Sequence, residues 1–145
     1  MHTLKCQVCI LIWQSHVLLH LLHIQSTVPN SSPLKVTQFH FTGWPDHGVP
    51  QNGVVLINFI KRVRTIHPYS DGCPLLVHCS AGVGRTGAFI VLDSMLERMK
   101  TEGNLNIFEF LEQLRAQRAL MVQTQVRLLL HQMTYIYFTS ICFFL

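Results

Sequence analysis

The chain has 145 residues, of which 49% are hydrophobic and 12% are charged. This length suits one domain that can bury a core. Eleven Lys and Arg residues against seven Asp and Glu residues give a formal net charge of +4, a mild basicity that argues against a nucleic-acid partner. The cysteines, at positions 6, 9, 73, 79 and 142, lack the spacing of a disulfide framework, which favours a reducing compartment.

Residues 1–35 are expected to be a divergent apolar N-terminal segment followed by a linker. The apolar run at 4–24 is interrupted by these polar residues: Gln7, Gln14, Ser15, His16, His20 and His23. The histidines recur at i, i+4 and i+7, which is the spacing of one helix face. No carboxylate or fourth ligand accompanies them, so we expect a partly polar helix face rather than a metal site. Proline and serine residues within 25–35 indicate the linker.

The following segments show strand and helix patterns in turn. Alternation at 36–42 predicts a strand, and a helical period predicts a helix over 53–66. The apolar face of this helix holds Leu56, Phe59, Ile60 and Val63. Basic residues off that face are expected to face solvent: Lys61, Arg62 and Arg64. Further along come a turn at 69–72, a strand at 74–77, a helix running to about Lys100 with a stop at Gly103, and a helix at 107–119.

The segment HCSAGVGRTG at 78–87 is the most informative part of the sequence. It places Cys79 after a predicted strand and Arg85 at the start of a predicted helix, with glycines around them. Helix N-termini and tight loops bind anions through unpaired N–H groups, and Arg85 can donate two parallel hydrogen bonds to phosphate oxygens. This positive field should lower the pKa of Cys79 below about 8.5 and give a thiolate nucleophile. A buried core cysteine is the alternative interpretation.

A thiolate that attacks a phosphate ester needs an acid to protonate the leaving oxygen. The segment WPDHGVP at 44–50 supplies Asp46, with prolines that stiffen the chain and Gly48 as a hinge. Taken alone, this segment is a plain turn in which Asp46 caps its own backbone. Beside a cysteine–arginine anion loop, we interpret Asp46 as a general acid.

Together these two segments resemble the phosphotyrosine-specific protein tyrosine phosphatases. The stretches QFHFTGWPDHGVP and LRAQRALMVQT are most similar to receptor-type members, and the resemblance covers about residues 36–124. It implies a truncated α/β catalytic domain over 36–125. That domain would have a short sheet with the nucleophile strand inside it, flanking helices, and a phosphate-binding loop between strand and helix. It also implies hydrolysis of phosphotyrosine in proteins with no metal or other cofactor.

The resemblance further implies roles for single residues. Cys79 would form a cysteinyl phosphate, and Asp46 would act first as acid and then as base. Thr86 would ease departure of the thiolate, His78 would tune the pKa of Cys79, and Gln123 would position the hydrolytic water. The phosphate would be bound by Ser80, Ala81, Gly82, Val83, Gly84 and Arg85.

The resemblance also implies supporting roles for two further pairs of residues. Trp44 and Pro45 would form the hinge of the acid loop. Arg115 and Arg118 resemble a pair that braces the catalytic loop from behind, although their spacing fits an ordinary surface pair equally well.

Departures from the family pattern leave two alternatives open. The part of the domain that precedes the acid segment is missing, including an Asn-Arg-Tyr loop whose aromatic ring stacks on phosphotyrosine. None of the tyrosines at 69, 135 and 137 lies in such a motif. The alternatives are a catalytically silent phosphotyrosine-binding fragment and an unstable splice or truncation fragment, since missing strands leave exposed sheet edges.

Residues 126–145 are expected to be a divergent apolar tail. The run at 128–145 is broken by His131 and Gln132, and a membrane span needs about 20 mostly apolar residues. We therefore favour a packed helix or an adhesive end over a membrane anchor for this tail. The expected location is cytoplasmic, or the cytoplasmic face of a membrane if the chain belongs to a receptor-type product.

Overall fold

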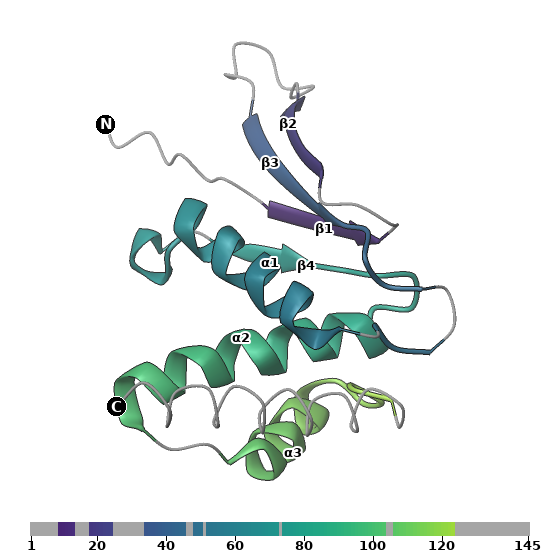
Figure 1. Cartoon of the computed structure of the whole chain (residues 1–145), viewed down its shortest axis with the longest axis vertical. Coiled ribbons are helices and arrows are strands. Elements are labelled where there is room, and N and C mark those ends of the chain that lie inside the picture. Colours follow the sequence, from purple (N-terminus) through teal and green to yellow (C-terminus); the bar gives the residue numbers. More distant parts are fainter. Residues whose placement is uncertain are drawn as a thin grey trace.

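A computed structural model describes residues 9–13, 18–24, 34–45, 48–50, 52–72, 74–103 and 106–123. These residues form a four-stranded sheet and three α-helices (Figure 1). In chain order the elements are β1 (Cys9–Trp13), β2 (Leu18–Ile24), β3 (Leu34–Phe41), α1 (Gly53–Ile66), a short 3-10 helix (Tyr69–Asp71), β4 (Leu75–Val77), α2 (Gly84–Glu102) and α3 (Ile107–Gln117). The helices predicted over 53–66 and up to Gly103 are confirmed, and α3 ends two residues before the expected 119.

The sheet has the strand order β2-β3-β1-β4. Strand β1 is parallel to both of its neighbours, with Ile10 opposite Gln38 on β3 and Leu76 on β4, while β2 is antiparallel to β3. The prediction that the nucleophile strand lies inside the sheet is therefore wrong for the described strands, because β4 is at one end. No strand among the described residues pairs with the outer edge of β4.

The prediction of a helix within residues 4–24 is also wrong, because β1 and β2 occupy much of that run. Short apolar runs cannot be assigned to strand or helix by period alone, and strands of parallel sheets read as continuous apolar stretches. His20 and His23 lie in β2, in register with Gln38 and Lys35 of β3, so the helix on which the histidines would share a face is not formed there. His16 and the tail at 126–145 lie outside the described residues. Part of the segment expected to be divergent thus joins the sheet that carries the site.

Helix α1 begins where its sequence supplies a cap. The Asn52 side chain accepts a hydrogen bond from the Val54 N–H at 2.9 Å, which satisfies one of the unpaired donors of the first turn. Helix α3 begins in the same way, with the Asn106 side chain accepting from the Glu109 N–H at 3.2 Å. Helix α2 ends at Gly103, whose φ of 65° is the left-handed conformation that glycine adopts without strain.

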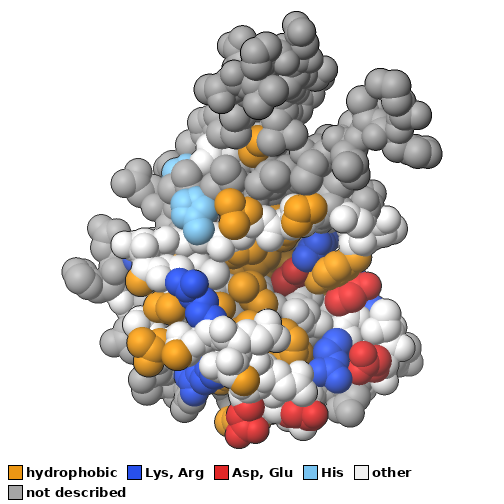
Figure 2. Space-filling model, turned by 180° about the vertical axis from the view of Figure 1, so that it is seen from behind, with side chains coloured by type: hydrophobic (Ala, Val, Ile, Leu, Met, Phe, Trp, Pro, Cys, Tyr) orange, Lys and Arg blue, Asp and Glu red, His pale blue; other side chains and the backbone are white. Residues whose placement is uncertain are grey.

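The hydrophobic core lies between the sheet and the helices. Helix α1 contacts β3 and α2, and α2 lies between α1 and α3 (Figure 1). Three aromatic rings connect these layers: the Phe59 ring centroid lies 4.9 Å from that of Phe41 and 6.2 Å from that of Phe89. Such pairs contribute beyond the area they bury. In Figure 2, charged side chains of both signs gather over the helices, whereas hydrophobic side chains cross the middle of the face.

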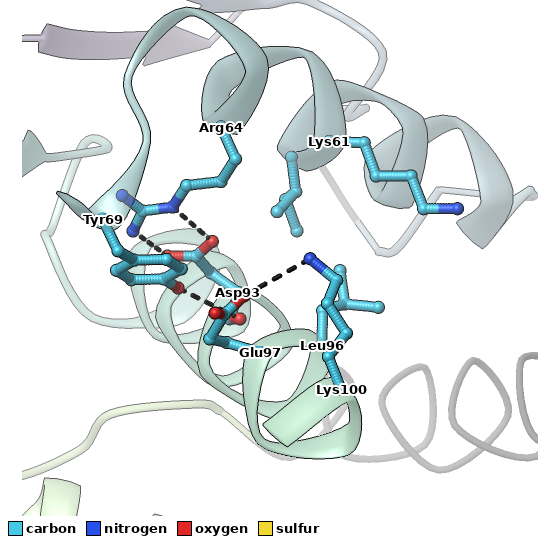
Figure 3. Close-up of a pocket in the computed structure, with 8 residues that line it drawn as sticks. Lys61, Arg64, Tyr69, Asp93, Leu96, Glu97 and Lys100 are labelled. Atoms are coloured by element: carbon cyan, nitrogen blue, oxygen red, sulfur yellow. Dashed lines mark hydrogen bonds and ion pairs between the residues drawn. The ribbon is translucent and has the colours of Figure 1, made fainter. Parts of the chain in front are cut away.

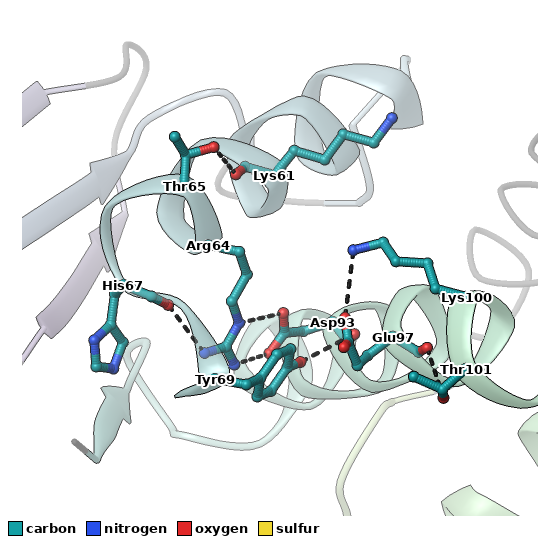
Figure 4. A network of polar contacts seen from close by, with 9 residues as sticks. All are labelled: Lys61, Arg64, Thr65, His67, Tyr69, Asp93, Glu97, Lys100 and Thr101. Carbon is teal, nitrogen blue, oxygen red and sulfur yellow. Dashed lines mark hydrogen bonds and ion pairs between the residues drawn. The ribbon is translucent and has the colours of Figure 1, made fainter. Parts of the chain in front are cut away.

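Arg64 was expected to face solvent, and that prediction is wrong. Its side chain is only 19% exposed and forks onto Asp93 of α2, with Nε donating to Oδ1 at 2.8 Å and a second bond joining the same two side chains (Figure 4). A buried carboxylate needs such a partner, because an unpaired charge away from water is costly. The pair ties α1 to α2. No helix among the described residues is long and apolar enough to cross a membrane.

Replacing His67 with leucine should stabilise the fold. The His67 side chain is 1% exposed, and neither ring nitrogen has a hydrogen-bond partner in the described part of the chain. Because a buried unpaired polar group costs about 1–3 kcal/mol, His67→Leu should raise the free energy of unfolding by about 1 kcal/mol in urea titrations. The matched control His67→Gln keeps a polar group there and should give no gain. A leucine variant less stable than the original chain would contradict this assignment.

Candidate active site

Residues 78–83 connect the end of β4 to the start of α2. No side chain caps the first residues of α2 at Val83, so the N–H groups of its first turn remain directed at the loop. Gly82 has a φ of 66°, a conformation that places successive N–H groups on one side of a tight turn. The loop thus ends at the N-terminus of α2, the kind of position at which backbone N–H groups can meet an anion.

Cys79 lies half-buried at the base of this loop. The Thr86 hydroxyl donates to the Cys79 Sγ at 3.1 Å. Burial alone would raise the pKa of the Cys79 thiol. The Thr86 hydroxyl and the backbone N–H groups of Thr86, Gly82 and Val83 outweigh burial and lower the pKa below its usual value. A lowered pKa increases the thiolate fraction of this free cysteine, and the thiolate is the reactive form of the side chain.

Arg85 connects the loop to the predicted acid segment. Its Nη2 donates to the Pro45 carbonyl oxygen at 3.0 Å, across 40 residues of sequence. The neighbouring Trp44 is 4% exposed, and its Nε1 donates to the Gly48 carbonyl oxygen at 3.0 Å. Asp46 and His47 lie between these anchors and outside the described residues. The structure thus brings the Pro45 flank of the acid segment to Arg85, at the start of α2.

The segment that carries Gln123 packs directly on the start of α2. The Val122 N–H donates to the Val83 carbonyl oxygen at 3.1 Å, and a Cβ added at Gly87 would lie only 2.7 Å from the Val122 nitrogen. A Cβ at Gly84 would lie 3.2 Å from the Gln123 Oε1, so that amide lies beside the loop. Val122 is fully buried with a φ of 61°, a strained conformation for a β-branched residue that this packing enforces.

Two arginines of the α3 end hold this arrangement in place. Arg115 donates from Nε to the Met121 carbonyl oxygen at 2.9 Å and from Nη2 to the Val122 carbonyl oxygen at 2.8 Å. The Arg118 Nη2 lies 3.1 Å from the position that a Cβ would take at Gly82. Of the two interpretations that the sequence left open, bracing is the one that these contacts support.

The structure therefore gathers most of the predicted site around one loop. Gly82, Val83, Gly84, Arg85 and His78 are partly buried, whereas Ser80 and Ala81 are exposed. Sequence reasoning missed the Val83 carbonyl as an acceptor and the pairing of Arg64 with Asp93. A signal for the pairing was available, because Asp93 falls among the apolar positions of a predicted helix and a carboxylate there requires a cation.

Comparison with known proteins identifies the class. A sequence model described as protein-tyrosine phosphatase matches residues 2–137. Receptor-type tyrosine-protein phosphatase epsilon of Rattus norvegicus is 47% identical over 116 residues, which is 79% of this chain and 16% of that protein. Receptor-type tyrosine-protein phosphatase S of Gallus gallus is 51% identical over 96 residues, covering 66% of this chain and 6% of that protein.

The chain belongs to the protein-tyrosine phosphatase family. Receptor-type tyrosine-protein phosphatase alpha of Homo sapiens is a further relative, 49% identical over 92 residues that make up 63% of this chain and 11% of that protein. The chain thus spans no more than about a sixth of these relatives' length. The family match over 2–137 is longer than the resemblance at about 36–124.

Removing the Thr86 hydroxyl should raise the pKa of Cys79. Thr86→Val deletes the side-chain donor to Sγ while keeping the shape of the residue, so the thiolate loses one of the bonds that favour it. Alkylation of Cys79 by iodoacetamide, followed by mass spectrometry across a pH series, should then show its midpoint at higher pH. Thr86→Ser retains the hydroxyl and should match the original chain. An unchanged midpoint in the valine variant would mean that Thr86 does not set the thiol pKa.

Alanine substitutions at two glycines should differ in their cost to stability, because one glycine contacts backbone and the other a flexible side chain. Gly87→Ala forces a methyl group against the Val122 backbone, which cannot move without breaking its bond to Val83, so we expect a loss of about 2–3 kcal/mol in unfolding free energy. Gly84→Ala meets only the flexible Gln123 side chain, so its cost should stay below about 1 kcal/mol. Equal stability of the two variants would argue against the described packing.

Proposed function

We propose that this chain hydrolyses phosphotyrosine in proteins through a cysteinyl-phosphate intermediate. The observation that carries the proposal is the thiol of Cys79, held by Thr86 and by loop N–H groups that lower its pKa, at the N-terminus of a long helix. Family membership supports the same reaction. The chain spans 16% of the length of the rat relative, so we propose this activity for the chain and do not carry it over from the whole relative.

In the first step, the Cys79 thiolate attacks phosphorus, so an S–P bond forms as the P–O bond to the tyrosine oxygen breaks. Asp46 donates its proton to that departing oxygen. Arg85 and the N–H groups of residues 80–84 hold the phosphoryl oxygens, where charge redistributes in the transition state. The bond from Arg85 to Pro45 supports this step, because the residue that holds phosphate also touches the flank of the acid segment.

In the second step, water attacks phosphorus, gives its proton to Asp46 and displaces the thiolate. Gln123 orients that water, and the Thr86 hydroxyl stabilises the departing sulfur. The position of the Gln123 amide beside Gly84 supports the first role. The hydrogen bond from Thr86 to Sγ supports the second. We assign tuning of the Cys79 pKa to His78, and the hinge of the acid loop to Trp44 and Pro45.

The substrates are phosphotyrosine-containing proteins, and the location is the cytoplasm or the cytoplasmic face of a membrane. A reducing compartment keeps Cys79 as the thiolate that the reaction needs. The division of the chain into 1–35, 36–125 and 126–145 remains a prediction. Because β1 pairs with both β3 and β4, a domain that begins before residue 36 is an alternative division to test.

Turnover of p-nitrophenyl phosphate by purified chain that melts cooperatively tests the proposal. We expect metal-independent release of p-nitrophenol, abolished in Cys79→Ser. Folded protein without turnover would contradict the proposed enzyme and support the alternative, a silent phosphotyrosine-binding fragment. Protein that does not melt cooperatively would support the third possibility, an unstable fragment.

Asp46→Ala should slow the chemical step without abolishing the binding of phosphotyrosine. Loss of the proton donor should slow turnover by a factor of about 10²–10⁴, while capture of a phosphotyrosine peptide persists because the anion loop is intact. Stopped-flow turnover and peptide binding by calorimetry measure the two effects. Asp46→Asn, which keeps the shape of the side chain, should behave as the alanine variant does. Turnover unchanged in both variants would refute the assignment of the acid.

A further inference from the structure

Tyr69 completes a polar cluster that lies outside the cysteine loop. It lies on the 3-10 helix Tyr69–Asp71, between α1 and β4, and its side chain is 46% exposed. The Arg64 guanidinium carbon lies 3.6 Å from the centroid of the Tyr69 ring, and the Tyr69 hydroxyl donates to the Asp93 carbonyl oxygen at 3.2 Å (Figures 3 and 4). One exposed ring therefore covers the ion pair that joins α1 to α2.

The surroundings of the hydroxyl contain charges of both signs. The residues that line a small hollow beside the ring include Lys61, Arg64, Asp93, Glu97 and Lys100. Figure 3 shows the hydroxyl directed at α2, toward Asp93 and Glu97, while Lys61 and Lys100 extend on the other side of the hollow. Burial, followed by the negative charge of Asp93, raises the pKa of Tyr69, so the phenol stays protonated and acts as a donor.

We propose that Tyr69 is a phosphorylation site and that its modification opens the Arg64–Asp93 pair. A tyrosine kinase would transfer the γ-phosphoryl group of ATP to the phenol oxygen, with release of the phenolic proton and ADP. This inference does not depend on the proposed phosphatase activity. It rests on the position of one exposed tyrosine over the cation that holds two helices together.

The chemistry of the phosphate determines the effect. A phosphotyrosine carries about −1.5 to −2 charges at neutral pH and no longer has a hydroxyl to donate. Its negative charge disfavours the position that the hydroxyl held against the Asp93 carbonyl oxygen, because that oxygen carries partial negative charge. The Arg64 guanidinium stacks on the Tyr69 ring, and a guanidinium binds phosphate in the same forked geometry that it uses for a carboxylate. The phosphate therefore competes with Asp93 for Arg64.

Access by a kinase is consistent with the local structure. The segment is short, with Pro68 before it and Gly72 in the left-handed conformation after it, and the contacts of the Tyr69 side chain include the hydroxyl bond to Asp93 and the stacking of Arg64 on the ring. Short segments at the surface open locally at low cost compared with global unfolding. Opening exposes the hydroxyl without disrupting α1 or α2.

The test uses the full chain with Cys79→Ser, Tyr135→Phe and Tyr137→Phe, so that Tyr69 is the remaining tyrosine and no thiol at 79 can remove its phosphate. After incubation with magnesium-ATP and a broad-specificity tyrosine kinase, we expect one phosphate on Tyr69 by mass spectrometry. The melting temperature of the phosphorylated chain should then be lower by about 4–8 °C. The same chain with Tyr69→Phe should take up no phosphate and show no effect of the kinase.

A second measurement reports on the ion pair itself. The Arg64 Nε–H signal in nitrogen-15 NMR should shift on phosphorylation, because its acceptor changes from the Asp93 carboxylate to a phosphate. Two results would overturn the inference. One is folded protein that resists the kinase while its unfolded form is phosphorylated at Tyr69. The other is phosphorylated protein whose melting temperature and Arg64 signal are unchanged.

Discussion

The carbonyl oxygen of Val83 is the point on which the described site depends. It accepts the Gly87 N–H at 3.1 Å, which begins helix α2, and the Val122 N–H at 3.1 Å, which attaches the segment carrying Gln123. One backbone atom thus fixes the start of the helix that faces the anion loop and the position of the amide beside it. The absence of a side chain at Gly87 is what permits this approach, since a Cβ there would meet the Val122 nitrogen.

Helix α2 connects the cysteine loop to the other two helices. Its first turn borders the cysteine loop, its middle pairs Asp93 with Arg64 of α1, and its far side packs on α3. Arg115 of α3 returns to the same region through the Met121 and Val122 carbonyl oxygens, which closes a ring of contacts. Displacement of any of these elements would move the thiol relative to the groups that lower its pKa. The stability of the helix packing and the reactivity of Cys79 are therefore coupled.

Local chemistry explains which features the sequence could predict. Helix α1 was predictable to the residue because Asn52 caps its start and its apolar period is regular, and Gly103 identified the end of α2. The sequence also located a loop between β4 and α2, because its glycines follow a predicted strand and precede a predicted helix, while its binding of an anion stays a prediction. Strands β1 and β2 were not, since short apolar runs suit helix and strand alike. The end position of β4 depends on pairing between distant segments, which no local pattern encodes.

The central claim is that Cys79 in this loop carries the phosphoryl group during turnover. Rapid acid quench of the chain during reaction with an aryl phosphate, followed by phosphorus-31 NMR and peptide mass spectrometry, tests the claim directly. The account predicts a phosphorus–sulfur species confined to the peptide that contains Cys79. It should accumulate in the Gln123→Ala variant, in which attack by water is slowed. Phosphate on any other residue, or turnover with no phosphorylated Cys79 in either protein, would contradict the account.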